Sequence, residues 1–161
     1  MTLSPNNAQL SSTHMISSAA LCIDGDTEGP TCHSNGSGSY PWLAISFPEP
    51  VEVTRVVIYN RRDYGARTKN LEVRLTDVLP TSEEAMFNGG KLFGTFTGPG
   101  KDGEIIIIEG SVKKGRYVLI QNGFWILNFH EVKVFGYAPL TRRKRNANSP
   151  NVPPPPVRGL Y

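Results

Sequence analysis

The stretch VEVTRVVIYNRRD, residues 51–63, decides the fold of this chain. Most of its residues are β-branched or aromatic, and these residue types favour extended strands. The odd-numbered positions from Val51 to Tyr59 form a mostly apolar face, whereas the even-numbered positions begin polar at Glu52 and turn apolar at Val56. Apolar residues on both faces are typical of a strand that is covered on both sides. The stretch therefore predicts a strand that ends fully buried.

Similar short runs recur along the chain, rich in Val, Ile, Phe and Tyr and separated by clusters of Gly, Pro, Asn and Asp. Their spacing of roughly ten residues is typical of an antiparallel sandwich or barrel. Only residues 82–86 are compatible with a helical turn, so the sequence predicts an all-β fold. The expected strands are residues 42–47, 51–60, 70–76, 91–96, 104–108, 116–121 and 131–137.

The bulk composition indicates one folded unit. A chain of 161 residues with 39% hydrophobic residues can build one core. The formal net charge is +3, and the basic run RRKR at residues 142–145 contributes more than that excess. The remaining chain is close to neutral, so we expect no nucleic-acid surface. No apolar stretch approaches the roughly 18 residues that a membrane-spanning helix needs.

The C-terminal segment differs in composition from the rest. Residues 1–140 are predicted to form the β-sandwich, and residues 141–161 a basic, proline-rich and disordered tail. Pro153, Pro156 and Arg158 match the PxxPxR pattern that SH3 domains bind, with a plain proline-rich linker as the alternative. The RRKR run fits a proprotein-convertase site or, equally, a solvated basic linker.

Several segments, in order, resemble one known superfamily. They are SSAALCIDGD at residues 17–26, PWLAISF at 41–47, VTRVVIYNRRD at 53–63, GPG at 98–100, GRYVLIQ at 115–121 and EVKVFG at 131–136. Together they resemble the discoidin superfamily (coagulation factor type C domains) and, most closely, its fucose-binding branch, the F-type lectins. The resemblance implies a discoidin-like antiparallel β-sandwich, a jelly-roll barrel of about eight strands with its binding loops at one end.

The IDGD turn that contains Asp24 and Asp26 is a candidate cation site. Calcium takes six to eight oxygen ligands, and two carboxylates in a tight turn can supply some of them, although such a turn can also be only a turn. The resemblance implies a structural calcium ion that joins this loop to the last strand. The implied ligands are the carbonyl oxygens of Leu21, Asp26 and His130 and the side chains of Asp24, Thr31 and Glu131.

The resemblance also implies a sugar site. F-type lectins bind fucose through a histidine, an R-x-D motif and a second basic residue, because imidazole and guanidinium groups donate directed hydrogen bonds to sugar oxygens. Tyr64 or Tyr40 could pack against the apolar face of the sugar. The spacings from His33 to Arg61 and from Asp63 to Arg67 each differ by one residue from those of the family. The expected ligand is therefore fucose or a related sugar. The corresponding residues are His33, Arg61, Asp63 and Arg67.

The expected function is therefore binding without catalysis. The chain contains no G-x-S-x-G elbow, H-E-x-x-H motif or Walker loop. The predicted partner is a glycan or glycoprotein, fucosylated ones included. The alternative is an adhesion module that binds protein or an anionic phospholipid surface. In that alternative residues 124–127, FWIL, are a membrane-contacting tip, unless they form a buried strand or turn.

The two cysteines bear on location. Cys22 and Cys32 could close one short loop, while the disulfides that the resemblance implies are missing, and His130 is expected to pack in place of a cysteine. We expect an extracellular or cell-surface protein. A cytoplasmic location stays open, because the N-terminus has neither the basic nor the apolar region of a signal peptide.

Overall fold

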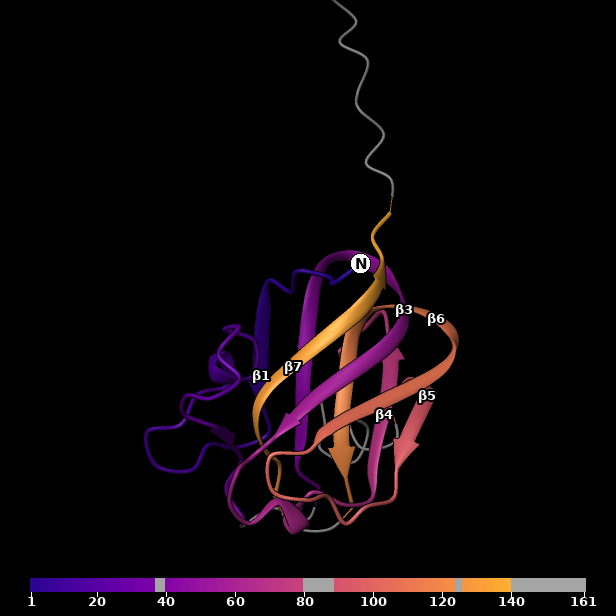
Figure 1. The fold of residues 1–161 in the computed structure, drawn as a ribbon. Helices are drawn as coiled ribbons and strands as arrows, with labels where there is room; N and C mark the ends of the chain where they lie inside the picture. The colour runs from indigo at the N-terminus through magenta and orange to yellow at the C-terminus, as the bar shows by residue number, and fades with distance from the viewer. Residues whose placement is uncertain (37–39, 80–88, 124–125, 140–161) are drawn as a thin grey trace, which may run out of the picture.

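The computed structural model describes residues 1–36, 40–79, 89–123 and 126–139 (Figure 1). The predicted all-β fold is confirmed, and no helix in these ranges is long and apolar enough to cross a membrane. The expected helical turn at 82–86 and the predicted tail lie outside the described residues. The strands are β1 (Asn7–Leu10), β2 (Cys32–His33), β3 (Trp42–Asn60), β4 (Leu71–Thr76), β5 (Lys91–Phe96), β6 (Ile105–Asn122) and β7 (Asn128–Tyr137), with 3-10 turns η1 (Ala19–Cys22) and η2 (Gly65–Arg67).

Two long strands, β3 and β6, build both layers of the sandwich. The hydrogen-bonded order is β2-β7-β3-β6-β4-β5, and β1 pairs with the first half of β3. Each half of β3 pairs with the opposite half of β6, from Trp42 against Gln121 to Tyr59 against Ile105. Both strands bend so that the sheet folds over on itself (Figure 1). Four of the predicted short strands are therefore the halves of two continuous ones.

A β-bulge in β3 changes which side chains face the core. The register of β3 against both β6 and β7 shifts between Val53 and Arg55. An extra residue in a strand moves the following side chains to the opposite face. Val53 is buried before the bulge, and Val56 and Ile58 are buried after it. The expectation that one odd-numbered face runs from Val51 to Tyr59 is therefore wrong beyond the bulge, where Tyr59 lies on the outer face.

The core lies between the two layers and is almost entirely apolar. Burying each large side chain contributes on the order of 1.5–3 kcal/mol relative to leaving it exposed. The largest fully buried apolar side chains of this core are Phe47, Phe129, Leu43, Ile45, Ile58, Leu71, Leu75, Ile120 and Leu127, whereas Leu119 packs in a separate cluster with Trp42 and Ala44. This core fixes both ends of the sandwich and, with them, the loops.

The N-terminal segment runs beside the last strand, at the end of the sandwich that lies away from η2 (Figure 1). The Leu3 backbone N–H donates to the Val134 carbonyl at 2.8 Å, and the Gly136 N–H donates to the Met1 carbonyl at 2.9 Å. Residue 2 forms an isolated bridge with Phe135. The first residues and the end of β7 are thus held together.

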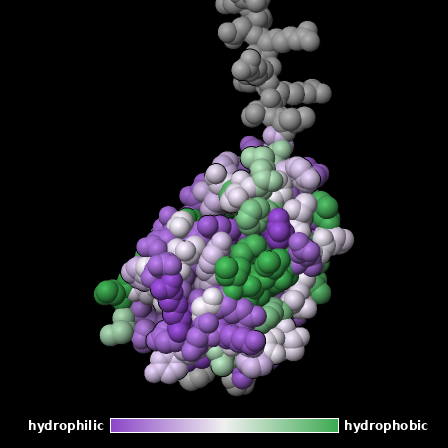
Figure 2. All heavy atoms as spheres, viewed as in Figure 1, coloured by the Kyte–Doolittle hydropathy of each residue, from purple (hydrophilic) through white to green (hydrophobic). Residues whose placement is uncertain are grey.

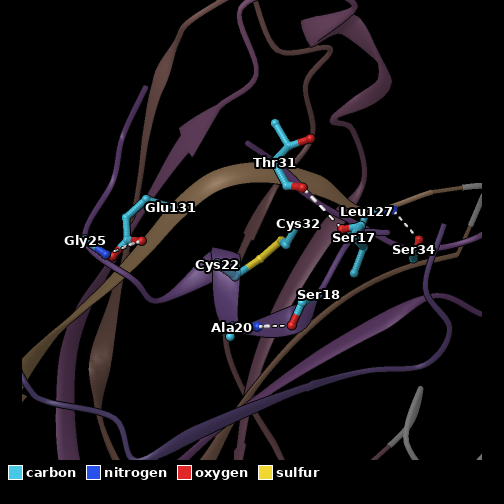
Figure 3. The surroundings of a disulfide bond; sticks show 10 residues. All are labelled: Ser17, Ser18, Ala20, Cys22, Gly25, Thr31, Cys32, Ser34, Leu127 and Glu131. Atoms are coloured by element: carbon cyan, nitrogen blue, oxygen red, sulfur yellow. Dashed lines mark hydrogen bonds between the residues drawn. A yellow bond between two sulfur atoms is a disulfide. The ribbon is translucent and has the colours of Figure 1, made fainter. Parts of the chain in front are cut away.

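A disulfide ties the first loop, residues 11–31 between β1 and β2, to β2. Cys22, at the end of η1, is bonded to Cys32, and their Cα atoms are 5.3 Å apart (Figure 3). Both side chains are fully buried. The bond closes a short loop that contains the predicted cation ligands Asp24 and Asp26.

We expect reduction of this disulfide to lower the free energy of unfolding by about 2–3 kcal/mol, because a cross-link restricts the unfolded chain. Urea unfolding with and without dithiothreitol measures the difference. The Cys22→Ala/Cys32→Ala variant is the control, since its unfolding should not respond to the reductant. Equal stability of the wild-type protein in both conditions would contradict the cross-link.

Candidate functional site

The loops that follow β3 and β5 meet at the end of the sandwich far from the N-terminus (Figure 1). Asn60, the last residue of β3, joins them and is only 2% exposed. Its amide nitrogen donates to the carbonyls of Gly65 at 3.0 Å and Lys101 at 2.9 Å. Its oxygen accepts from the Arg61 backbone N–H at 3.0 Å and the Thr68 hydroxyl at 2.8 Å. The Asn60 side chain therefore holds the arginine-containing loop, residues 61–70, against the loop that contains Lys101.

A second contact fixes the same loop. The carboxylate of Asp102 accepts from the Gly65 N–H at 2.6 Å. A Cβ at Gly65 would collide with the backbone of Lys101, so the two loops approach as closely as they do because residue 65 is glycine. The arginine-containing loop is thus held by the end of β3 and by the loop that follows β5.

Arg61, Asp63, Tyr64 and Arg67 form one cluster on this loop. Arg61 donates to Asp63 Oδ1 through Nε at 3.0 Å and Nη2 at 2.8 Å. This hydrogen bond holds the pKa of the Asp63 carboxyl below its usual value. The guanidinium carbons of Arg61 and Arg67 lie 5.3 and 4.5 Å from the centre of the Tyr64 ring, within cation–π range. Tyr64 is 62% exposed and the Asp63 side chain 67%, whereas the Arg61 side chain is only 13% exposed, so the cluster presents Tyr64 and Asp63 to solvent while Arg61 is mostly covered.

His33 on β2 lies close enough to this cluster for the charges of Arg61 and Arg67 to lower its pKa. Burial lowers the pKa of the imidazole, and the charges of His14, Arg61 and Arg67 lower it further, against the hydrogen bond with Ser34. Nδ1 lies 2.7 Å from the Ser34 carbonyl oxygen, which can only accept, so Nδ1 carries the proton and Nε2 can accept one. The structure thus brings His33 to the side of the sandwich that carries the arginines.

Two further residues complete the description of this end. The His14 ring packs against His33 with centroids 4.8 Å apart, a contact that the sequence did not indicate. Tyr40 is exposed and begins the second described range, after residues 37–39. Tyr64, one of the two predicted aromatic contacts, lies within cation–π range of both arginines.

The first loop contains the predicted cation ligands. Asp24 Oδ1 accepts from the Asp26 N–H at 2.9 Å, and Asp26 Oδ1 accepts from the N–H groups two and three residues later. Glu131 on β7 reaches this loop and accepts from the Gly25 N–H at 3.0 Å (Figure 3). The Asp26 side chain is therefore occupied within the turn, which leaves its carbonyl, the atom that the resemblance assigns. Ser17 donates to the Thr31 carbonyl at 3.2 Å.

The electrostatics of this loop suit a hard cation. The pKa of Glu131 is raised to about 7, mainly by burial and also by the charges of Asp24 and Asp26, against the Gly25 hydrogen bond and the charge of Lys133. Within the described part of the chain, no three His, Cys, Asp or Glu side chains converge as a metal site. A cation here would need carbonyl and hydroxyl oxygens as well, and these are the donors that Leu21 and Thr31 supply.

His130 packs between β7 and the first loop, as expected. Its Nδ1 lies 2.7 Å from the Gly29 carbonyl oxygen, and its buried Nε2 has no partner among the described residues. The prediction of a membrane-contacting tip at residues 124–127 is wrong for Ile126 and Leu127, because both are buried. The Leu127 N–H donates to the buried Ser34 hydroxyl at 2.9 Å, and residues 124 and 125 lie outside the described ranges.

Known proteins share this fold. Residues 21–120 match the F5/F8 type C family model described as a NedA-like, galactose-binding domain. The lectin domain of lectinolysin, complexed with Lewis B antigen, is 23% identical over 82% of this chain and 93% of that chain, with a TM-score of 0.66. A fucolectin from the serum of striped bass (Morone saxatilis) is 24% identical over 81% of this chain and 46% of that chain, with a TM-score of 0.70. A Streptococcus pneumoniae fucose binding module is 21% identical over 84% of this chain and 95% of that chain, with a TM-score of 0.66. No curated protein sequence matched the chain.

We expect Asn60→Ala to lower the free energy of unfolding by about 2–4 kcal/mol, because it leaves several buried polar groups without partners. Thr68→Val removes one of these hydrogen bonds and should cost about 1 kcal/mol. Urea unfolding measures both. Asn6→Ala is the matched control, since the Asn6 side chain accepts an exposed hydrogen bond from the Ser46 hydroxyl and its backbone hydrogen bond is kept in the variant. An effect of Asn60→Ala no larger than that of Asn6→Ala would contradict the role given to Asn60.

Proposed function

The chain belongs to the F5/F8 type C family of galactose-binding-like domains, and from this premise we propose that it is a non-catalytic carbohydrate-binding module. The observation that carries the proposal is the cluster that Arg61 and Arg67 form around the exposed Tyr64, with His33 nearby. Two structural neighbours, the lectin domain of lectinolysin with Lewis B antigen and the Streptococcus pneumoniae fucose binding module, support the same class of ligand.

The cluster has the chemistry that sugar recognition needs. Guanidinium groups present several N–H donors in a fixed plane, and sugar hydroxyls and ring oxygens accept from them. Asp63 holds the Arg61 side chain in one orientation, which lowers the entropy that binding would otherwise cost. The unprotonated Nε2 of His33 can accept from a hydroxyl, and the exposed part of the Tyr64 ring can pack against the C–H face of a sugar.

Fucose or a related sugar on a glycoconjugate is the ligand that we propose. The support comes from the residue types at His33, Arg61, Asp63 and Arg67 and from the similarity of the fold to a fucolectin and a fucose binding module. We propose an extracellular or cell-surface location on the strength of the Cys22–Cys32 disulfide, because such bonds persist in oxidising compartments.

We also propose that calcium binds at the first loop. Asp24 and Glu131 would hold it with their carboxylates, Thr31 with its hydroxyl, and Leu21, Asp26 and His130 with their carbonyls. When bound, a calcium ion would supply positive charge beside carboxylates that repel one another. It would thereby join the first loop to β7 and stiffen the loop end.

We expect L-fucose or Lewis B antigen to bind the wild-type protein and Arg61→Ala to weaken that binding at least tenfold, because the variant removes charged donors to the sugar. Isothermal titration calorimetry measures the affinity, with galactose as the comparison sugar. Arg55→Ala is the matched control, because Arg55 is half-exposed on the body of β3 and pairs with Glu109. Binding to anionic vesicles and to none of the sugars would favour the adhesion alternative.

We expect calcium to raise the melting temperature of the wild-type protein and EDTA to reverse the shift, because a ligand that binds only the folded state stabilises it. Glu131→Gln keeps the shape of the side chain and should abolish the shift. Glu52→Gln changes the same residue type at an exposed position and should leave it intact. A calcium shift that survives in Glu131→Gln would place the ion elsewhere.

A further inference from the structure

A hollow lies at the loop end, beside the Arg61 cluster, between the first loop and the arginine-containing loop. Its volume is about 180 Å³. Pockets that enclose drug-sized ligands measure roughly 300–1,000 Å³, so this hollow suits a single ring. Its lining residues are Thr27, Glu28, Tyr59, Asn60, Arg62, Gly103 and Ile105. None of these residues belongs to the cluster of Arg61, Asp63, Tyr64 and Arg67.

The floor of the hollow is the outer face of the sheet. Tyr59 lies between Glu131 of β7 and Ile105 of β6 in register, and the Lys133 ammonium lies 4.9 Å from the centre of its ring. Ile105 and Ile107 are 55% and 56% exposed. Figure 2 shows an apolar patch, surrounded by hydrophilic residues, on the face where β3 and β6 cross in Figure 1. The bulge in β3 turns Tyr59 outward and so provides this floor.

The rim of the hollow carries one charge of each sign. Arg62 Nη2 and Glu28 Oε1 are 2.5 Å apart, with side chains 60% and 69% exposed. Exposed ion pairs contribute little to stability. Breaking or rearranging this pair to bind a ligand would therefore cost little. Glu28 disfavours an anionic ligand and Arg62 a cationic one. Neutral hydroxyl groups can accept from Arg62 and donate to Glu28, and Thr27 adds a hydroxyl of its own.

We propose that this hollow is a second glycan subsite, which holds the sugar residue next to the one bound by Arg61 and Arg67. The inference rests on the proposed function. Arg61 and Arg62 are consecutive in the chain but engage different partners, Asp63 and Glu28. Because adjacent Cα atoms are about 3.8 Å apart, the two subsites adjoin the same turn of the chain. An aromatic floor with a polar, charge-balanced rim matches the two faces of a pyranose ring.

The test compares a monosaccharide with an oligosaccharide. We expect Glu28→Ala and Arg62→Ala to leave L-fucose binding unchanged and to weaken binding of Lewis B antigen about tenfold, measured by calorimetry. Glu109→Ala is the matched control, because it breaks another exposed ion pair, with Arg55, on the same strand pairing. All three variants should unfold at the same temperature as the wild-type protein.

A filling variant checks the hollow in a different way. Thr27→Trp leaves the Arg62–Glu28 pair in place and blocks the space, so it should also weaken only the oligosaccharide. In NMR spectra of the wild-type protein, Lewis B antigen should shift the Thr27 and Gly103 amides, whereas L-fucose should shift those near Tyr64 alone. Variants that bind Lewis B antigen as tightly as wild type would overturn the subsite and leave the sugar site standing. A wild-type protein that binds neither sugar would overturn both.

Discussion

The antiparallel pairing of β3 with β6 is the constraint on which the rest of the structure depends. It runs from Trp42 against Gln121 to Tyr59 against Ile105 and passes through both layers. Because the two strands cross from one layer to the other, the positions of the core, of β7 and of β4 follow from their register. The pairing also fixes where β3 ends, and Asn60 then determines the path of the chain that leaves it.

The binding end uses charge in a local and paired form. Arg61 pairs with Asp63, Arg62 pairs with Glu28, and the guanidinium of Arg67 lies over Tyr64. Directed donors held in this way suit a ligand rich in hydroxyl groups better than they suit a diffuse anionic surface. The burial of Leu127 points the same way, since a side chain packed in the core cannot enter a bilayer.

The sequence predicted the elements better than their connections. Alternating apolar residues located the strand at 71–76 to within one residue and β5 at both ends. The proline and glycine clusters that suggest turns stand instead at bends within β3 and β6, where the register shifts but pairing continues. The bulge near Val53 could not be read from alternation, because an extra residue leaves composition unchanged and exchanges only the faces. The strands β1 and β2 are too short to show any period.

The same division holds for the candidate site. His33, Arg61, Asp63 and Arg67 were found through resemblance, and the structure brings them to one end. Asn60 was missed, although a polar side chain at the end of a buried strand is a recognisable signal for a buried hydrogen-bond network. The contact of His14 with His33 depends on how the first loop folds, which no local pattern encodes.

The backbone pairing of the first residues with the end of β7 has a topological consequence. Both ends of the folded unit leave from the side opposite the loops, so a short linker could join them and new ends could be opened elsewhere, giving a circularly permuted domain. Likewise, the domain could be inserted as a unit into a surface loop of another protein. In either arrangement every loop at the far end would remain unobstructed.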